Sequence, residues 1–166
     1  HKINWYSARS FAVCFNHLVQ SYLLCTMAKV RLTKKFSFEM AHALLNYDGK
    51  CKNIHGHSYH LEVTVIGEPR NEPGHPEDGL VIDFGELKKA VKGSVVDIFD
   101  HTLVMKANHG DDLTEMLSQN FERMIYTEYQ PTCENLILDF AERIKAALPA
   151  RASLHHLILH ETATSY

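Results

Sequence analysis

The chain has 166 residues, a formal net charge of -3 with neutral histidines, 45% hydrophobic residues and 22% charged residues. This length favours one domain with a sizeable core, and the composition is ordinary for a globular protein. The weak charge argues against a nucleic-acid partner, and no segment argues for a membrane partner. Four cysteines in a chain this long do not form a disulfide framework, so we expect a reduced, cytoplasmic protein.

Residues 1–26 differ from the rest of the chain. They lack an initial Met, and their apolar run Phe11–Cys25 is broken by polar residues. The run is too short for a transmembrane helix, and no clear small-residue cleavage motif marks an export signal. Met27 fits a natural translation start. We therefore expect residues 1–26 to be a non-native or disordered N-terminal extension, followed by a single domain at residues 27–166.

Two strands are predicted by apolar residues at every second position. Val30–His42 alternates in this way with one exception, and His42 ends its apolar row. In Tyr59–Ile66 the odd-numbered residues up to 65 form a second row. Successive side chains of a strand point to opposite faces. If this second strand begins at His55, then His55 and His57 share the face of its apolar row, and pairing of the strands would bring His42 to them.

Three imidazoles on one face can hold a zinc ion and leave a position open, whereas a structural zinc site has four protein ligands. Cys51, four residues before His55, is then either a separate thiol or the fourth ligand of a closed site. The blander interpretation is chance, because twelve histidines make close pairs frequent, and a lone cysteine is usually a small buried hydrophobe. The coincidence of a thiol, a same-face pair and a third histidine favours the metal site.

The rest of the chain predicts an α+β fold, an antiparallel sheet with two helices on one face. Period-3.6 stripes identify the helices, and proline and glycine mark the long loop. In chain order we expect a loop at 67–79, a strand segment Leu80–Ile82, a helix from the N-cap Asp83 to Ile98, a short helix Leu113–Phe121, a short strand Arg123–Tyr129, a helix from the N-cap Thr132 to Leu148, and a strand Leu154–Thr162.

A set of motifs over residues 29–166 resembles the 6-pyruvoyl-tetrahydropterin synthase family. Each motif alone is weak, but together and in this order they are specific. The branch most similar to this chain is 6-carboxy-tetrahydropterin synthase, of the queuosine pathway. The motifs are Phe38-Glu-x-Ala-His42, Cys51-x-x-x-His55-Gly-His57, Val81-Ile-Asp-Phe-Gly-Glu-Leu-Lys88, Asp100-His101, Pro131-Thr-x-Glu134-Asn-Leu136 and His160-Glu161-Thr162.

The resemblance implies a tunnelling fold, in which subunit sheets join into a barrel within a homohexamer of two trimers, with active sites between subunits. It implies a zinc-dependent lyase that converts 7,8-dihydroneopterin triphosphate to 6-carboxytetrahydropterin, acetaldehyde and triphosphate. By motif, it assigns zinc to His42, His55 and His57, the catalytic thiol to Cys51, the acid/base pair to Asp100 and His101, and pterin binding to Glu161, Thr132 and Glu134.

The residue types suit this chemistry. A thiol has an ordinary pKa of about 8.5, close enough to neutral for a nearby cation to tune Cys51 as a base. The carboxylate of Glu161 can accept both N–H groups of a pterin edge. Without the resemblance, Glu161 reads as a solvent-exposed acid, Thr132 as a simple helix cap, and Asp100-His101 as a helix end.

Two other functions remain open at this point. One is the pyruvoyl-forming enzyme of the same family, which eliminates triphosphate without releasing acetaldehyde. The other is a non-catalytic zinc-binding protein with a closed Cys-His site. The chain also departs from the family after Asp100-His101, where a longer polar segment runs from residue 106 to 129.

Overall fold

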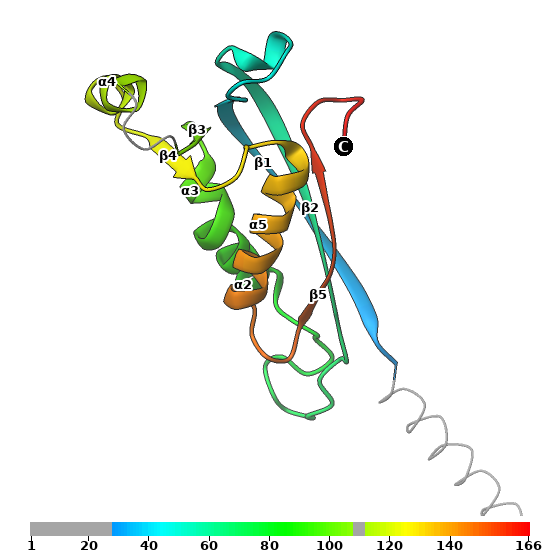
Figure 1. Ribbon diagram of the computed structural model, residues 1–166. Coiled ribbons are helices and arrows are strands. Elements are labelled where there is room, and N and C mark those ends of the chain that lie inside the picture. Colours follow the sequence, from blue (N-terminus) through cyan, green and yellow to red (C-terminus); the bar gives the residue numbers. More distant parts are fainter. Residues whose placement is uncertain (1–27, 108–111) are drawn as a thin grey trace, which may run out of the picture.

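In the computed structural model, a five-stranded sheet carries helices on one face (Figure 1). The structure describes residues 28–107 and 112–166, so the extension expected at residues 1–26 lies outside the described residues. The strands are β1 (Val30–Ala43), β2 (His55–Gly67), β3 (Thr102–Lys106), β4 (Met124–Thr127) and β5 (Ser153–His160). The helices are η1 (Lys50–Lys52), α2 (Phe84–Val91), η2 (Lys92–Val96), α3 (Asp97–Phe99), α4 (Asp112–Asn120) and α5 (Cys133–Ala147).

The two longest strands, β1 and β2, form the antiparallel pair that their alternating rows predict. The register sets Phe38 opposite Tyr59 and His42 opposite His55. On β1, Phe38, Met40 and His42 are buried, whereas Glu39 and Ala41 between them are more exposed. On β2, Tyr59 is buried and its neighbours Ser58 and His60 are exposed. Alternation therefore predicted both strands and the face that each presents to the core.

The sheet is mixed, so the expectation of an antiparallel sheet is wrong at one edge. Its order is β4-β3-β1-β2-β5, and β3 runs parallel to both of its neighbours. The sequence pattern does not predict β3, because Thr102, Val104 and Met105 are all buried and the strand has no clean alternation. A short strand buried on both faces lacks the period of two that identifies half-buried strands.

Two expected strand segments are not strands. Leu80–Ile82 pairs with no strand of the described sheet, although Val81 and Ile82 bury their side chains in the core. Strand β5 ends at His160 rather than Thr162. The reason is local, because the backbone N–H groups of Glu161 and Thr162 donate to the carbonyl of Ser165 instead of a sheet partner.

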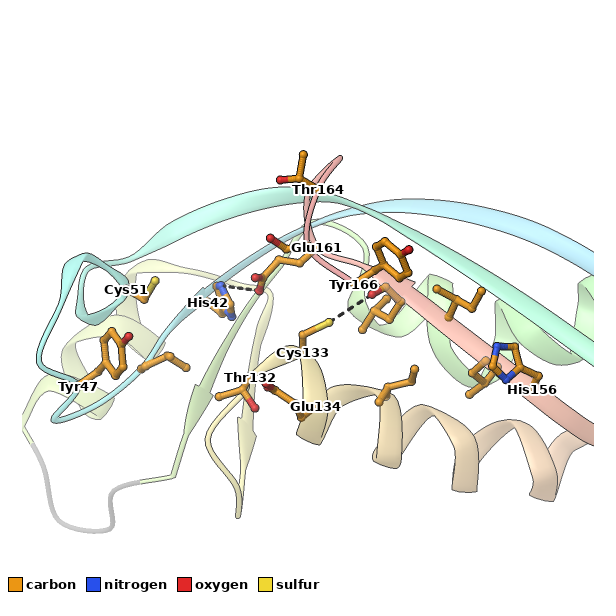
Figure 2. A pocket seen from close by; sticks show the side chains of 16 residues that line it. His42, Tyr47, Cys51, Thr132, Cys133, Glu134, His156, Glu161, Thr164 and Tyr166 are labelled. Carbon is orange, nitrogen blue, oxygen red and sulfur yellow. Dashed lines mark hydrogen bonds and ion pairs between the residues drawn. The ribbon is translucent and has the colours of Figure 1, made fainter.

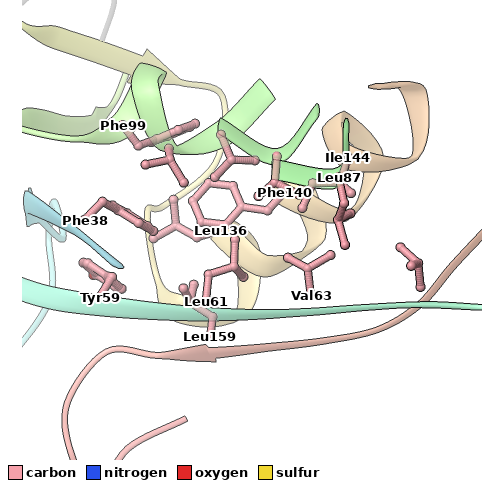
Figure 3. Close-up of a cluster of buried hydrophobic side chains, with 14 of the residues drawn as sticks. Phe38, Tyr59, Leu61, Val63, Leu87, Phe99, Leu136, Phe140, Ile144 and Leu159 are labelled. Carbon is pink, nitrogen blue, oxygen red and sulfur yellow. The ribbon is translucent and has the colours of Figure 1, made fainter. Parts of the chain in front are cut away.

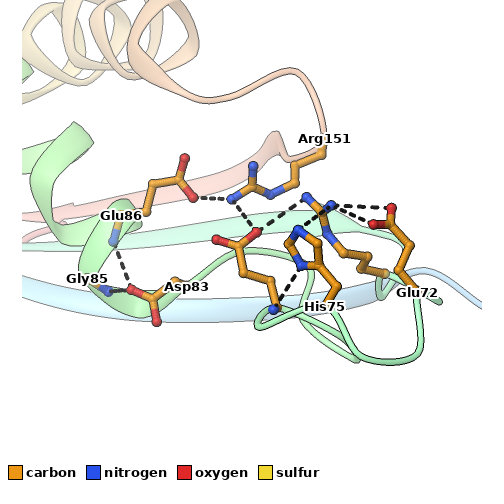
Figure 4. Close-up of polar contacts among 8 residues, drawn as sticks. Glu72, His75, Asp83, Gly85, Glu86 and Arg151 are labelled. Atoms are coloured by element: carbon orange, nitrogen blue, oxygen red, sulfur yellow. Dashed lines mark hydrogen bonds and ion pairs between the residues drawn. The ribbon is translucent and has the colours of Figure 1, made fainter.

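The helix expected after Asp83 is confirmed, including its N-cap. The Asp83 carboxylate accepts hydrogen bonds from the backbone N–H groups of Gly85 at 2.7 Å and Glu86 at 3.2 Å (Figure 4). Helix α2, the π-helical turn η2 and α3 then follow one another to Phe99. Figure 4 also shows Arg151, from the turn before β5, paired with Glu86 at the start of α2.

Two further helices agree with the sequence pattern. Helix α5 is capped by Thr132, whose hydroxyl accepts a hydrogen bond from the N–H of Asn135. The short helix α4 matches the expected Leu113–Phe121, but it stands apart from α2 and α5, beyond β4 (Figure 1). The short helix is therefore confirmed, but it is not part of the layer that α2 and α5 form on the sheet. None of the helices in the described ranges has the length and apolar character needed to cross a membrane.

The main hydrophobic core lies between the sheet and α5 (Figure 3). Phe140 of α5 is fully buried, and its ring meets Phe99 edge-on at 4.8 Å and Phe38 at 6.1 Å between centroids. This packing joins α5, the end of α3 and strand β1. The core therefore fixes the N-terminus of α5 against the end of the sheet that carries His42.

We expect Phe140→Ala to lower the free energy of unfolding by about 3–5 kcal/mol, because it leaves a cavity beside the rings of Phe38 and Phe99. Leu138→Ala is the matched control, since Leu138 lies on the same helix and is 65% exposed. Its expected effect is within about 0.5 kcal/mol. Urea unfolding followed by circular dichroism measures both, and equal effects would contradict this account of the core.

Candidate active site

Three histidines meet at one end of the sheet. His42 of β1 lies directly opposite His55, the first residue of β2, and His57 follows two residues later on the same face. Their ring centroids are 4.5 Å (His42–His55), 5.0 Å (His55–His57) and 5.3 Å (His42–His57) apart. One nitrogen of each lies within 4.8 Å of the others. The structure thus brings together the three residues that the sequence singled out.

Two of these histidines direct lone pairs at each other. Nδ1 of His42 donates to the carbonyl of Pro131 at 2.7 Å, and Nδ1 of His55 donates to the carbonyl of Asn53 at 2.8 Å. A neutral imidazole has one N–H, so both Nε2 atoms then carry lone pairs. These atoms are 3.1 Å apart. Two nitrogens on one tetrahedral zinc stand about 3.3 Å apart, given Zn–N bonds near 2.0–2.1 Å.

The third histidine supplies a polar atom without a partner. Nε2 of His57 is buried and makes no hydrogen bond within the described part of the chain. Burial also lowers the pKa of His42 below its usual value, which keeps this imidazole neutral, as a metal ligand must be. Two nitrogens with lone pairs and a third, buried ring nitrogen without a partner fit a bound cation. The donor set of three imidazoles suits zinc or another borderline transition metal.

A cavity of about 790 Å³ opens beside the histidines (Figure 2). His42, Cys51 and Glu161 line it, from three separate segments of the chain. Cys51 lies in η1, and its carbonyl accepts a hydrogen bond from the N–H of Leu44, which fastens this turn to the end of β1. The described candidate metal ligands that lie mutually close are the three histidines, without Cys51.

The N-terminus of α5 forms another wall of this cavity, where Thr132 and Glu134 both line it. Glu134's own backbone N–H and the hydroxyl of Thr132 hold the pKa of the Glu134 carboxyl below its usual value. Cys133, between them, donates from Sγ to the carbonyl of Leu159 at 3.4 Å. Burial, with Glu161 and Glu134 nearby, raises the pKa of the Cys133 thiol to about 11, so it stays protonated near neutral pH.

Asp100 and His101 pair with each other, away from this cavity. Nδ1 of His101 lies 3.0 Å from Oδ1 of Asp100. The backbone N–H of Glu39, with His101, holds the pKa of Asp100 below its usual range. His101 has a φ of 55° and lines a second cavity of about 720 Å³ together with His57. Within one chain, Cys51 and His101 therefore line different cavities, the first together with His42 and the second together with His57.

The sequence reasoning missed one residue at this site, Tyr59. It counted Tyr59 only as a member of an apolar row, yet the phenol donates to Oε1 of Glu161 at 3.1 Å. Burial, with Glu161 beside it, raises the pKa of Tyr59 far above its usual value, so the phenol stays a donor. A tyrosine in a buried row needs a partner for its hydroxyl, and this was the available signal.

Comparison with known proteins identifies the family. Residues 31–166 match the family model described as 6-pyruvoyl tetrahydropterin synthase. The chain belongs to the 6-pyruvoyl tetrahydropterin synthase family. The resemblance seen in the motifs is therefore confirmed.

Relatives within this family carry different names. The 6-carboxy-5,6,7,8-tetrahydropterin synthase of Haemophilus influenzae is 32% identical over 138 residues, which cover 82% of this chain and 95% of that protein. The dihydroneopterin monophosphate aldolase of Pyrococcus furiosus is 32% identical over 133 residues, 80% of this chain and 90% of that protein. The structure of Caenorhabditis elegans 6-pyruvoyl tetrahydropterin synthase aligns with a TM-score of 0.60 and 26% identity, covering 84% and 94% of the two chains.

Proposed function

We propose that this member of the family is a zinc-dependent lyase. It converts 7,8-dihydroneopterin triphosphate and one water to 6-carboxy-5,6,7,8-tetrahydropterin, acetaldehyde and triphosphate, a reaction of queuosine and related deazapurine synthesis. The observation that carries the proposal is the cavity that joins His42, Cys51 and Glu161. The similarity to the Haemophilus protein, with its 6-carboxy name, favours this product over the others in the family.

His42, His55 and His57 hold the zinc in this proposal. Their nitrogens are already gathered, and the carbonyls of Pro131 and Asn53 fix two of the rings in the tautomer that leaves Nε2 free. When bound, zinc supplies a Lewis acid that polarises a side-chain hydroxyl of the substrate and makes the adjacent carbon easier to deprotonate. The histidines alone do not fill a tetrahedral site, so the substrate can reach the ion.

Glu161 recognises the pterin ring in this proposal. Its carboxylate can accept the two neighbouring N–H donors of the pterin edge, and charge-assisted bonds of this kind are strong and directional. Tyr59 already donates to Oε1, which leaves accepting positions on the same carboxylate for the ring. Thr132 and Glu134 line the same cavity and support the pterin from the N-terminus of α5.

Cys51 is the base that removes the proton in this proposal. It lines the cavity with His42, and its neighbours Lys50 and Lys52 in η1 are exposed. Cys133 cannot replace it, because its pKa of about 11 keeps that thiol protonated. The two cysteines of one cavity thus have different roles.

Asp100 and His101 return the proton, with Asp100 orienting the imidazole of His101. Because His101 lines a different cavity from Cys51, we propose that a neighbouring copy completes each site, in a homohexamer of two trimers whose sheets form a barrel. Sedimentation of the full chain at the mass of six copies is the expected result. A monomer that turns over substrate would contradict the shared site.

Product analysis tests the proposed reaction. The purified, zinc-loaded chain is incubated with 7,8-dihydroneopterin triphosphate, and the products are identified by mass spectrometry. We expect 6-carboxytetrahydropterin and one equivalent of acetaldehyde. Loss of triphosphate without acetaldehyde would identify the pyruvoyl-forming reaction instead. Turnover of dihydroneopterin monophosphate, but not of the triphosphate, would instead indicate the aldolase activity named for the Pyrococcus relative. A protein that binds zinc but turns over none of these pterins would contradict an enzymatic role.

A further inference from the structure

Tyr59 lies on the boundary between the core and the histidines. Its side chain is fully buried and its ring stacks on Phe38, with centroids 5.4 Å apart and 9° between the planes. On the other side it meets the rings of His57 at 5.7 Å and His42 at 6.3 Å. The core therefore holds the ring of Tyr59 in place, and its hydroxyl points to Glu161, 3.1 Å away.

Glu161 is close enough to the histidines to become a ligand itself. Its Oε1 lies 3.5 Å from Nε2 of His42 (Figure 2). The same oxygen lies 4.0 Å from Nε2 of His57. A divalent cation held by the histidines would attract this carboxylate strongly in a partly buried site. Three histidines and one glutamate would then make a closed, four-ligand site.

The backbone of Glu161 is fixed, but its side chain depends on Tyr59. The N–H groups of Glu161 and Thr162 donate to the carbonyl of Ser165, and Thr162 accepts from Thr164 and Ser165 through its hydroxyl. These bonds hold the turn after β5. The carboxylate of Glu161 is bonded by the phenol of Tyr59, which competes with the cation for the same oxygen.

We propose that Tyr59 is a positioning residue, which holds the Glu161 carboxylate toward the substrate and away from the metal, so that one coordination position stays open. This inference rests on the proposed function, because it assumes a cation at the three histidines. It adds a reason for a buried phenol at this place, and it explains how a carboxylate can lie beside the histidines without closing their site.

Azide binding to the cobalt-substituted protein tests the inference without any turnover. Azide binds cobalt at an open position and changes its visible spectrum, so a titration gives a dissociation constant. We expect Tyr59→Phe to weaken azide binding about tenfold or more, since a hydrogen bond to a charged group is lost and Glu161 is released. The double variant Tyr59→Phe/Glu161→Gln should regain the affinity of the wild type, because the amide is a poor competitor for the cation.

Tyr129→Phe is the matched control. Tyr129 also donates from a partly buried phenol to a carboxylate, that of Asp139 of α5 at 2.7 Å. It should bind azide like the wild type, and thermal unfolding checks that both single variants fold. Equal weakening by Tyr59→Phe and Tyr129→Phe would overturn the inference.

The remaining outcomes separate this inference from the proposed function. Wild-type affinity for azide in Tyr59→Phe, with cobalt bound, would overturn the role of Tyr59 and leave the zinc enzyme standing. A wild-type protein that binds cobalt but shows no response to azide would have a closed site and would overturn both. A wild-type protein that takes up no cobalt at the histidines would also overturn both.

Discussion

Replacement of Cys51 by alanine is expected to lower kcat by about 10²–10⁴-fold, the usual contribution of a positioned base. The zinc content should stay at one per chain, because the close group of candidate ligands is made of His42, His55 and His57. Steady-state kinetics with 7,8-dihydroneopterin triphosphate and metal analysis of the same preparation measure the two quantities together. A Cys51→Ala protein with near wild-type turnover would contradict the mechanism.

Cys133→Ala is the control for this variant. Its thiol lines the same cavity, but its pKa of about 11 excludes it as a base near neutral pH. We expect activity within about tenfold of the wild type, well short of the loss in Cys51→Ala.

Mixing Cys51→Ala with His101→Ala chains tests the shared site, because random assembly would restore about a quarter of the sites. No regain of activity would place both residues in the same chain's site.

His57→Ala is expected to weaken zinc binding by more than about 100-fold and to abolish turnover. The change removes one of three ligands, a larger loss than the 10–100-fold seen when a supporting outer residue is changed. Nε2 of His57 is buried without a hydrogen bond to any described residue, so its removal breaks no hydrogen bond at that atom. Competition with a chelator for zinc measures the affinity, independently of catalysis.

The matched control is His60→Ala. His60 lies on the same strand, three residues further along β2, but it is exposed on the opposite face of the sheet. Zinc affinity and turnover should remain close to those of the wild type. If His57→Ala kept its zinc while His60→Ala lost it, the metal would have to lie on the other face of the sheet.

Much of the site follows from alternation in two strands. A period of two puts His42 at the end of one buried row and His55 and His57 at the start of another, and antiparallel pairing then leaves few registers that bury both rows. The observed pair, His42 opposite His55, is such a register. The N-caps Asp83 and Thr132 were predictable for a similar reason, because a capping side chain acts on the residues next to it.

Contacts between distant segments could not be predicted in this way. Strand β3 lies beside β1 in parallel, and nothing in its five residues specifies that partner. The bond from Tyr59 to Glu161 joins residues 102 positions apart. The separation of Cys51 from His101 depends on which cavity each of the two side chains lines. The spacing of the residues along the chain does not encode this.

The visible and near-ultraviolet spectrum of the cobalt-substituted protein tests the central claim, an open site of three histidines with a separate thiol. The account predicts weak d–d bands without a strong thiolate-to-cobalt charge-transfer band, and the same spectrum in Cys51→Ala. A strong charge-transfer band that disappears in Cys51→Ala would show that Cys51 is the fourth ligand. The site would then be closed, and the proposed base would be part of the metal centre.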